Sequence, residues 1–319
     1  MDTVSADRMV SVVIPVYNEK PNIESLYPEI TTVMQSAAVP YEIIFVDDGS
    51  ADTTGEYLRG LMAGDTAVRA ITLLNRFGKS AALSAGFDAV RGGIVVTLDG
   101  DCQDDPRDIT VFLEKIAGGA DMVCGWRTRR KDTLHKIIAS QCFNFITDIV
   151  TGNRFRDINS GMKAYRRNVL DNVTIYGELH RFIPVLVKAK GFQVAEVPVN
   201  NRPRRFGKSK FGLKRYMSGV LDLITVVFLT RFCKKPAHFF GPLALFLSTS
   251  GIVICSYIAY LRISSGTIHN RYPLLFLGIL LIIVGVQLFS IGLLGEMLAY
   301  ADKKREKNYV IKAGPPARP

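Results

Sequence analysis

Cysteine is scarce in this chain of 319 residues, and no two cysteines form a CxxC pair. The five are Cys102, Cys124, Cys142, Cys233 and Cys255. This spacing excludes a zinc ribbon and a disulfide framework, and it suits a reducing compartment. No GxGxxG follows the first β-rich run, and GxxxxGKS/T occurs nowhere in the sequence, so a dinucleotide-binding or P-loop enzyme is not expected.

Charge is almost absent from one long region. The chain has 40 Lys+Arg and 29 Asp+Glu, a net charge of +11 and 48% hydrophobic residues, which excludes a disordered or collagen-like chain. Between residues 237 and 301 only Arg262, Arg271 and Glu296 are charged. The segments 202–215 and 302–319 flank this region and together carry the whole positive excess. A basic chain binds nucleic acid or an anionic membrane. This distribution favours lipid phosphate and the bilayer surface, with no nucleic acid as partner.

Two uncharged runs, 239–261 and 273–295, are each long enough to cross the hydrocarbon core as a helix. The alternative is a pair of buried helices in a soluble core, which usually show a polar stripe that these runs lack. Glycines suited to close helix packing in lipid lie in or beside them, at Gly241, Gly251, Gly278, Gly285, Gly292 and Gly295. Glu296 is expected at the headgroup boundary or as a pairing residue between the helices.

The distribution of lysine and arginine predicts the orientation of these spans. The first ten residues lack a signal-peptide layout, so an even number of spans places both termini on one side. Basic residues precede the first span and follow the second, whereas the loop between them holds only two arginines. The positive-inside rule then predicts a multi-pass protein of the cytoplasmic (inner) membrane, with its large N-terminal part and both termini in the cytoplasm.

The remaining chain divides into three expected parts. Residues 1–212 form a soluble catalytic domain, 213–235 a region with apolar residues at helical spacing, and 302–319 a basic cytoplasmic tail. Within the middle region, 213–231 is interpreted as an interfacial helix lying along the membrane, with a plain packing helix as the alternative. The two spans and their loop occupy 236–301.

The soluble part alternates β-rich and helical segments. Strands are expected at 9–16, 41–46, 68–74 and 94–98, and helices at 22–38, 53–62, 80–91 and 106–117. Continuous apolar strands between helices predict an α/β fold with a mostly parallel sheet covered on both faces. Ligands of such sheets bind at the carboxyl ends of the strands.

Acidic residues follow the fourth expected strand. Asp99, Asp101 and Gln103 offer two carboxylates and an amide oxygen within a short loop, the hard ligands that Mg²⁺ or Mn²⁺ prefers. A solvated turn is the alternative, because acidic pairs are common in loops. Polar residues at two other strand ends, Glu19 and Asp48, favour a binding site.

Several segments in order resemble glycosyltransferase family 2: MVSVVIPVYNE, EIIFVDDGSADTT, LLNRFGKSAALSAGFDAVRG and VVTLDGDCQDDP. The later FRDINSGMKAYRR and VAEVPVNNRPRRFGKSKFG narrow the resemblance to the polyprenyl-phosphate glycosyltransferases. It runs from about residue 11 to 299. It implies the nucleotide-sugar-binding fold known as GT-A, and a membrane-bound inverting enzyme that moves a sugar from a nucleotide sugar to undecaprenyl or dolichyl phosphate. A UDP-sugar is preferred as donor, with GDP-mannose as the second choice.

The resemblance also implies roles for single residues. The nucleotide and donor residues are Pro15, Tyr17, Glu19, Asp48, Asp99, Gln103 and Arg202. The metal ligands are Asp99, Asp101 and Gln103, binding Mg²⁺ or Mn²⁺. The acceptor phosphate is assigned to Arg127, Arg130, Lys208 and Ser209. Asp157, together with Asp101, is assigned to catalysis. The second pKa of a phosphate monoester is about 6, so Asp157 is interpreted as orienting the acceptor or sugar, with base catalysis secondary.

Two other functions stay open at the level of sequence. A processive polysaccharide synthase shares the fold, but the chain has no QxxRW motif, and two spans are few for a translocation pore. A catalytically inert membrane scaffold is disfavoured by the intact acidic loop. Related enzymes imply a homo-oligomer, such as a tetramer.

Overall fold

The computed structural model of the chain describes residues 8–128, 155–173, 179–203, 225, 228, 232, 235–268 and 270–302. It divides into two compact units, Met1–Val226 and Val227–Pro319. The predicted interfacial helix at 213–231 and the basic tail lie almost wholly outside the described residues. The predicted boundaries at 212 and 235 stay predictions.

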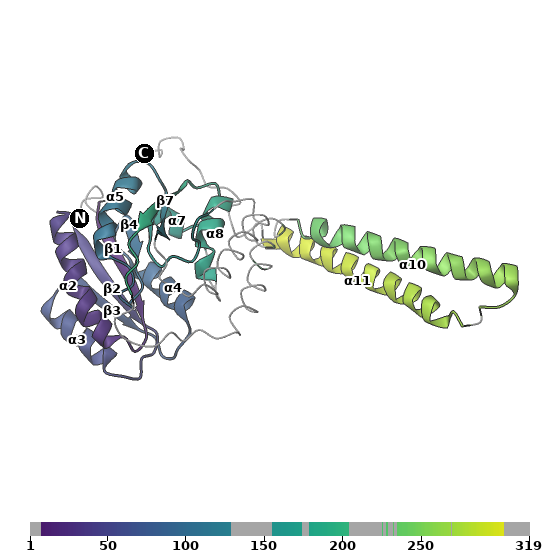
Figure 1. Cartoon of the computed structure of the whole chain (residues 1–319), viewed down its shortest axis with the longest axis horizontal. Coiled ribbons are helices and arrows are strands. Elements are labelled where there is room, and N and C mark those ends of the chain that lie inside the picture. Colours follow the sequence, from purple (N-terminus) through teal and green to yellow (C-terminus); the bar gives the residue numbers. More distant parts are fainter. Residues whose placement is uncertain are drawn as a thin grey trace. The chain divides into compact units, whose positions relative to one another are not determined.

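The N-terminal unit is built on a seven-stranded sheet of order β3-β2-β1-β4-β6-β5-β7 (Figure 1). Its strands are β1 (Val10–Val16), β2 (Tyr41–Asp47), β3 (Val68–Thr72), β4 (Ile94–Thr97), β5 (Met122–Arg127), β6 (Lys163–Arg166) and β7 (Val194–Val199). The neighbouring pairs are parallel except that β6 is antiparallel to both β4 and β5. The predicted, mostly parallel α/β fold is therefore confirmed.

Helices follow most of the strands. They are α2 (Lys20–Ser36), α3 (Thr54–Gly64), α4 (Lys79–Ala89), η1 (Pro106–Asp108), α5 (Ile109–Ala117), α7 (Arg167–Leu170), η2 (Leu179–Arg181) and α8 (Ile183–Ala189). The four strands and four helices expected from the sequence are present, with ends shifted by a few residues at most. The sequence did not predict β5, β6 and β7, nor α7, η2 and α8. In addition, the segment starting at Pro106 opens as a 3₁₀ turn, with Asp105 capping it by accepting from the backbone N–H of Arg107.

Alternation along β1 places two helical layers on opposite faces of the sheet. Val12 and Ile14 join the core formed with α2, α3 and α5. Val13 points the other way, toward α4, where a Cβ on Gly86 would collide with its Cγ1. Burial on both faces explains why these strands read as continuous apolar runs.

A polar network lies at the amino ends of β1 and β2, at the opposite end of the strands from the acidic loop. Ser11 donates to the buried Glu42 carboxylate at 2.6 Å, and Arg69 donates to its second oxygen at 2.8 Å. The backbone N–H of Arg91 donates to Glu42 as well, at 2.7 Å. Burial alone would raise the pKa of Glu42, but the bonds from Ser11, Arg69 and Arg91 hold it below its usual value.

The C-terminal unit contains two long helices, α10 (Ala237–Ser265) and α11 (Tyr272–Asp302), which lie side by side as a hairpin (Figure 1). Both are long and apolar enough to cross a membrane, with mean hydropathies of 1.8 and 2.8. Each helix extends beyond the span expected from the sequence, because its backbone stays helical past the charged residue that ends the uncharged run, Arg262 in α10 and Glu296 in α11. On α10 the helix ends at Gly266, which adopts the left-handed conformation that favours glycine.

The glycines of the hairpin permit close approach, as expected. A Cβ on Gly251 would lie 2.5 Å from the carbonyl oxygen of Gly278, and one on Gly285 would collide with Ser248. Gly241 differs, because a Cβ there would meet nothing within 4 Å. Glu296 also pairs the two helices: its Oε2 accepts the backbone N–H of Ala237, in the first turn of α10, at 3.3 Å.

Candidate active site

The loops after β1 and β2 are bonded to each other at the carboxyl edge of the sheet. Asn18 accepts the N–H of Ala51 at 2.9 Å and donates its own N–H to Ser50 at 2.8 Å. Its φ of 54° lies in the left-handed region, which asparagine tolerates better than most residues. The turn that carries Pro15, Tyr17 and Glu19 is thereby fixed beside the loop that carries Asp48.

Asp48 organises the loop that follows β3. Its carboxylate is 5% exposed and accepts the N–H groups of Phe77 at 2.7 Å and Gly78 at 2.9 Å. The same loop places the guanidinium of Arg76 over the ring of Tyr17, 4.3 Å from its centroid. The structure thus brings Tyr17 and Asp48 together at one corner of the sheet. Their assignment to the nucleotide stays a prediction.

The acidic loop follows β4 at the same edge. The N–H of Asp99 donates to Asp104 at 3.3 Å, and the N–H of Gln103 donates to Asp101 at 3.2 Å. Cys102 between them has a φ of 58°, so the loop holds one residue in a strained, left-handed conformation. This strain is consistent with a loop shaped for function, since such residues gather at functional sites.

Asp99 lies between two lysines that the sequence analysis did not assign. Lys79, the first residue of α4, forms an ion pair with its Oδ1. Lys163 is buried under the site and donates to the carbonyl of Ser160. Burial alone would raise the pKa of Asp99, but the charge and hydrogen bond of Lys79, followed by the charges of Lys163 and Arg127, hold it below its usual value. Burial lowers the pKa of Lys163.

Asp104 is buried in the same corner as Asp99 and Asp101. Burial, followed by the charges of Asp99 and Asp101, raises its pKa to about 7. Among the described residues no group of three or more His, Cys, Asp and Glu side chains is arranged to hold a metal ion. The two carboxylates and the Gln103 amide nevertheless fit a hard divalent cation, because a positive charge there would relieve the repulsion that Asp104 registers.

Arg127 and Asp157 form the second charged pair of the site. The Arg127 Nε and Nη2 donate to the two oxygens of Asp157 at 2.7 and 3.2 Å. The carboxylate is 2% exposed and the guanidinium 20%. Asp157 also accepts the N–H of Asn159 at 3.2 Å. A carboxylate held by three donors is fixed in orientation, and it in turn fixes the guanidinium at the end of β5.

Arg202 lies beside the acidic loop, where it contacts two acids. Its guanidinium forms an ion pair with Asp105 at 2.7 Å and another with Glu29 of α2. Burial alone would raise the pKa of Asp105, but Arg107 and Arg202 lower it to about 2. These contacts join β7, α2 and the acidic loop. The assignment of Arg202 to the donor stays a prediction.

Some predicted residues cannot be placed, and some residues beside Asp99 were not predicted. Arg130, Lys208 and Ser209 lie outside the described residues. Besides Lys79 and Lys163, Gly161 is a residue of the site that no sequence pattern predicted; a Cβ there would lie 2.5 Å from the Cγ of Asp99. A lysine at the start of a helix that follows a strand end was the available signal for Lys79. No local signal marks Lys163 or Gly161.

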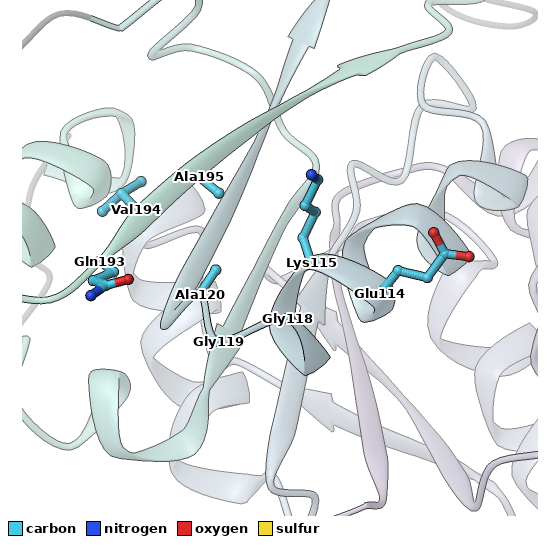
Figure 2. Close-up of a pocket in the computed structure, with 8 residues that line it drawn as sticks. All are labelled: Glu114, Lys115, Gly118, Gly119, Ala120, Gln193, Val194 and Ala195. Atoms are coloured by element: carbon cyan, nitrogen blue, oxygen red, sulfur yellow. The ribbon is translucent and has the colours of Figure 1, made fainter.

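A separate hollow of about 410 Å³ lies away from these residues (Figure 2). It is lined by the end of α5 and the segment after it, with Glu114, Lys115 and Gly119, and by Gln193 and Val194. These residues adjoin the amino ends of β5 and β7, whereas Asp99 lies at the opposite, carboxyl end of the strands. The hollow is therefore not part of the candidate active site.

Comparison with solved structures identifies the class of fold. Glucosyl-3-phosphoglycerate synthase from Mycobacterium tuberculosis matches with a TM-score of 0.54 at 20% identity, over 71% of this chain and 81% of that chain. That crystal holds Mn²⁺, UDP and glucosyl-3-phosphoglycerate, and another crystal of that enzyme holds Mg²⁺ and UDP. At this identity the likeness shows the fold alone, and the fold of the N-terminal unit is GT-A-like.

Comparison of sequences identifies the family. Residues 11–174 match the profile of glycosyl transferase family 2. Dodecaprenyl-phosphate galacturonate synthase of Rhizobium johnstonii is 34% identical over 95% of this chain and 92% of that protein. Undecaprenyl-phosphate 4-deoxy-4-formamido-L-arabinose transferase of Salmonella choleraesuis is 31% identical over 96% and 93%. The chain belongs to glycosyl transferase family 2 and is a glycosyltransferase.

Proposed function

We propose that the chain is a membrane-bound inverting glycosyltransferase that moves a sugar from a nucleotide sugar, preferably a UDP-sugar, to polyprenyl phosphate. The product is a lipid-phosphate-linked monosaccharide. The observation that carries the proposal is the near full-length similarity to two enzymes named for transfer to a polyprenyl phosphate. Two apolar helices of membrane length in the same chain support a lipid acceptor.

Asp99, Asp101 and Gln103 would hold Mg²⁺ or Mn²⁺ together with the donor diphosphate. A divalent cation supplies Lewis-acid stabilisation of a departing diphosphate. The chain's own contribution is the placement of these ligands. Asp99 is held by its backbone bond to Asp104 and by the close approach of Gly161. Tyr17 and Asp48 at the neighbouring corner would bind the nucleoside.

Arg127 would bind the acceptor phosphate, and Asp157 would position Arg127. A phosphate monoester is already largely ionised near neutral pH, so attack on the sugar needs no strong base. The three donors that Asp157 accepts favour an orienting role, because a general base must turn a lone pair toward the proton that it removes. Arg130, Lys208 and Ser209 would add contacts to the same phosphate.

The membrane part would keep the site near its lipid substrate. In this proposal α10 and α11 span the cytoplasmic membrane, with the catalytic domain, both termini and the basic segments in the cytoplasm. The region 213–235 lies at the interface and the tail 302–319 contacts anionic lipid. We also propose the division into 1–212, 213–235, 236–301 and 302–319, and assembly of the chain as a homo-oligomer.

Purified full-length protein tests the function directly. It is incubated in detergent with Mg²⁺ or Mn²⁺, undecaprenyl phosphate and a panel of labelled nucleotide sugars. A glycolipid with a single sugar is expected, and the Asp101→Asn variant should lose at least a hundredfold in rate. Asp88→Asn, an exposed aspartate of α4, is the matched control and should keep its rate. Polymer formation would instead indicate a processive synthase, and no turnover with any donor would indicate a scaffold.

A further inference from the structure

The ion pair between Lys79 and Asp99 occupies one of the oxygens that the proposed function gives to the divalent cation. The ammonium contacts Oδ1 of Asp99, and each side chain is 33% exposed. The pair is therefore open to solvent on one side. A cation that binds Asp99 has to compete with Lys79 for this oxygen.

The backbone on the Lys79 side of the pair is anchored. The preceding Gly78 donates its N–H to Asp48 at 2.9 Å. The following Ser80 is hydrogen-bonded through its hydroxyl to Nδ1 of His180 at 2.9 Å, and both of these side chains are buried. The chain is fixed on both sides of Lys79, so the motion left to the ammonium is that of its own flexible stem.

Asp99 is held in place as well, so it cannot move away when a cation competes with Lys79 for its oxygen. Its backbone is bonded to Asp104, and Gly161 packs so closely on the carboxylate that a Cβ there would lie 2.5 Å from Cγ. The second lysine, Lys163, is 5% exposed and bonded to a backbone carbonyl beneath the site. Lys163 is thus fixed in place, whereas Lys79 can be displaced.

Resting on the proposed function, we propose that Lys79 is a displaceable counter-ion: it holds Asp99 until a divalent cation replaces it, and it then pairs with the donor diphosphate. A released ammonium next to the cation can pair with the diphosphate that the cation also binds. Binding of the cation and of the nucleotide is then positively coupled through Lys79, and this coupling is reciprocal.

The test measures Mn²⁺ binding to the full-length protein in detergent by the loss of the free Mn²⁺ signal in electron paramagnetic resonance. Affinity is determined with and without UDP for the wild type and for Lys79→Gln. Without UDP, Lys79→Gln should bind Mn²⁺ about two- to fivefold tighter, which corresponds to about 0.4 to 1 kcal/mol for a partly exposed ion pair that no longer competes. The factor by which UDP tightens Mn²⁺ binding should fall by at least the same amount.

Lys115→Gln is the matched control, because Lys115 is an exposed lysine at the far edge of the sheet. It should leave both Mn²⁺ affinities unchanged. Equal or weaker Mn²⁺ binding by Lys79→Gln without UDP, in a protein with unchanged thermal unfolding, would overturn the proposal. If Lys79→Gln does not fold, Lys79→Arg decides. A guanidinium grips a carboxylate with two parallel bonds, so Mn²⁺ binding without UDP should weaken, and unchanged affinity would overturn the proposal.

Failure of the proposed function has a different signature. The wild type would then bind no Mn²⁺ even with UDP, Asp99→Asn would behave like the wild type, and no glycolipid would form. That result overturns both proposals. Normal glycolipid synthesis with no effect of Lys79→Gln on Mn²⁺ affinity overturns only the role of Lys79.

Discussion

Asp157 and Arg127 should act as one unit, and a double-mutant cycle can measure this. The perturbations are Asp157→Asn, Arg127→Gln and the two together. Asp157→Asn removes the countercharge of Arg127, whose side chain is 20% exposed. Arg127→Gln removes the countercharge of Asp157, whose side chain is 2% exposed. In the double variant neither charge remains, and two amides can share a hydrogen bond in the same place.

The magnitude follows from the two charge-assisted bonds of 2.7 and 3.2 Å. Bonds to charged groups contribute about 1.5 to 3 kcal/mol each. An amide in place of either charged group can still make one of the two bonds, so we expect each single variant to lose about one bond and about 10- to 150-fold in kcat/KM, by the conversion of about 1.4 kcal/mol per tenfold. The double variant should stay within about threefold of the worse single variant, because both changes remove the same interaction.

The assay is single-sugar transfer to undecaprenyl phosphate under kcat/KM conditions, with thermal unfolding recorded for each variant. A cycle on Arg167 and Asp171, an exposed pair 3.7 Å apart, is the control and should show almost no coupling. Losses that multiply in the double variant would refute the idea of one unit. Complete loss in Asp157→Asn that Arg127→Gln does not share would show that Asp157 is an essential base.

Three further changes probe other parts of the chain. Gly161→Ala should weaken Mn²⁺ and UDP binding, measured by calorimetry, at least tenfold with the fold intact, because the methyl group displaces the Asp99 carboxylate. Gly60→Ala in α3, where a Cβ meets nothing within 4 Å, is the control. Glu42→Gln should cost about 1 to 3 kcal/mol of unfolding free energy at pH 7. Because the pKa of Glu42 is lower folded than its ordinary 4.5, its contribution is present above that pH and lost as pH falls, so urea unfolding of the variant should depend less on pH between about 5 and 3. Glu296→Ala should lower the unfolding temperature in detergent through the loss of about 0.5 kcal/mol at the first turn of α10, with circular dichroism as the measurement.

The strands and helices up to residue 117 were predictable because their signals are local. Continuous apolar runs mark strands buried on both faces, and polar residues mark their ends. β6 was not predicted: it has four residues and pairs with strands far away in the sequence, in the antiparallel direction. No periodicity within so short a segment indicates its partner or its direction.

In the site, too, local signals were predictable and contacts between distant segments were not. Asp99, Asp101 and Gln103 were predictable together because five consecutive residues hold them all. The partners that balance them come from elsewhere in the chain: Lys79 lies 20 positions before Asp99, and Lys163 belongs to the unpredicted β6. Sequence patterns show which residues end a strand, whereas the pairing of charges depends on which strand ends become neighbours.

The pairing of charges bears on how a donor can enter. Lys79 holds Asp99 and Arg127 holds Asp157, so the resting site already pairs its acids with bases. The charges of Asp99 and Asp101 add to the effect of burial that raises the pKa of Asp104, so these carboxylates repel one another at the acidic loop. A diphosphate arriving alone adds negative charge at that point, and Coulomb repulsion over a few ångströms opposes it. A diphosphate arriving with a divalent cation adds little net charge and gives Lys79 a new partner. With the roles proposed for Asp99 and Lys79, the resting ion pairs would therefore favour joint entry of nucleotide and cation over separate binding of either one.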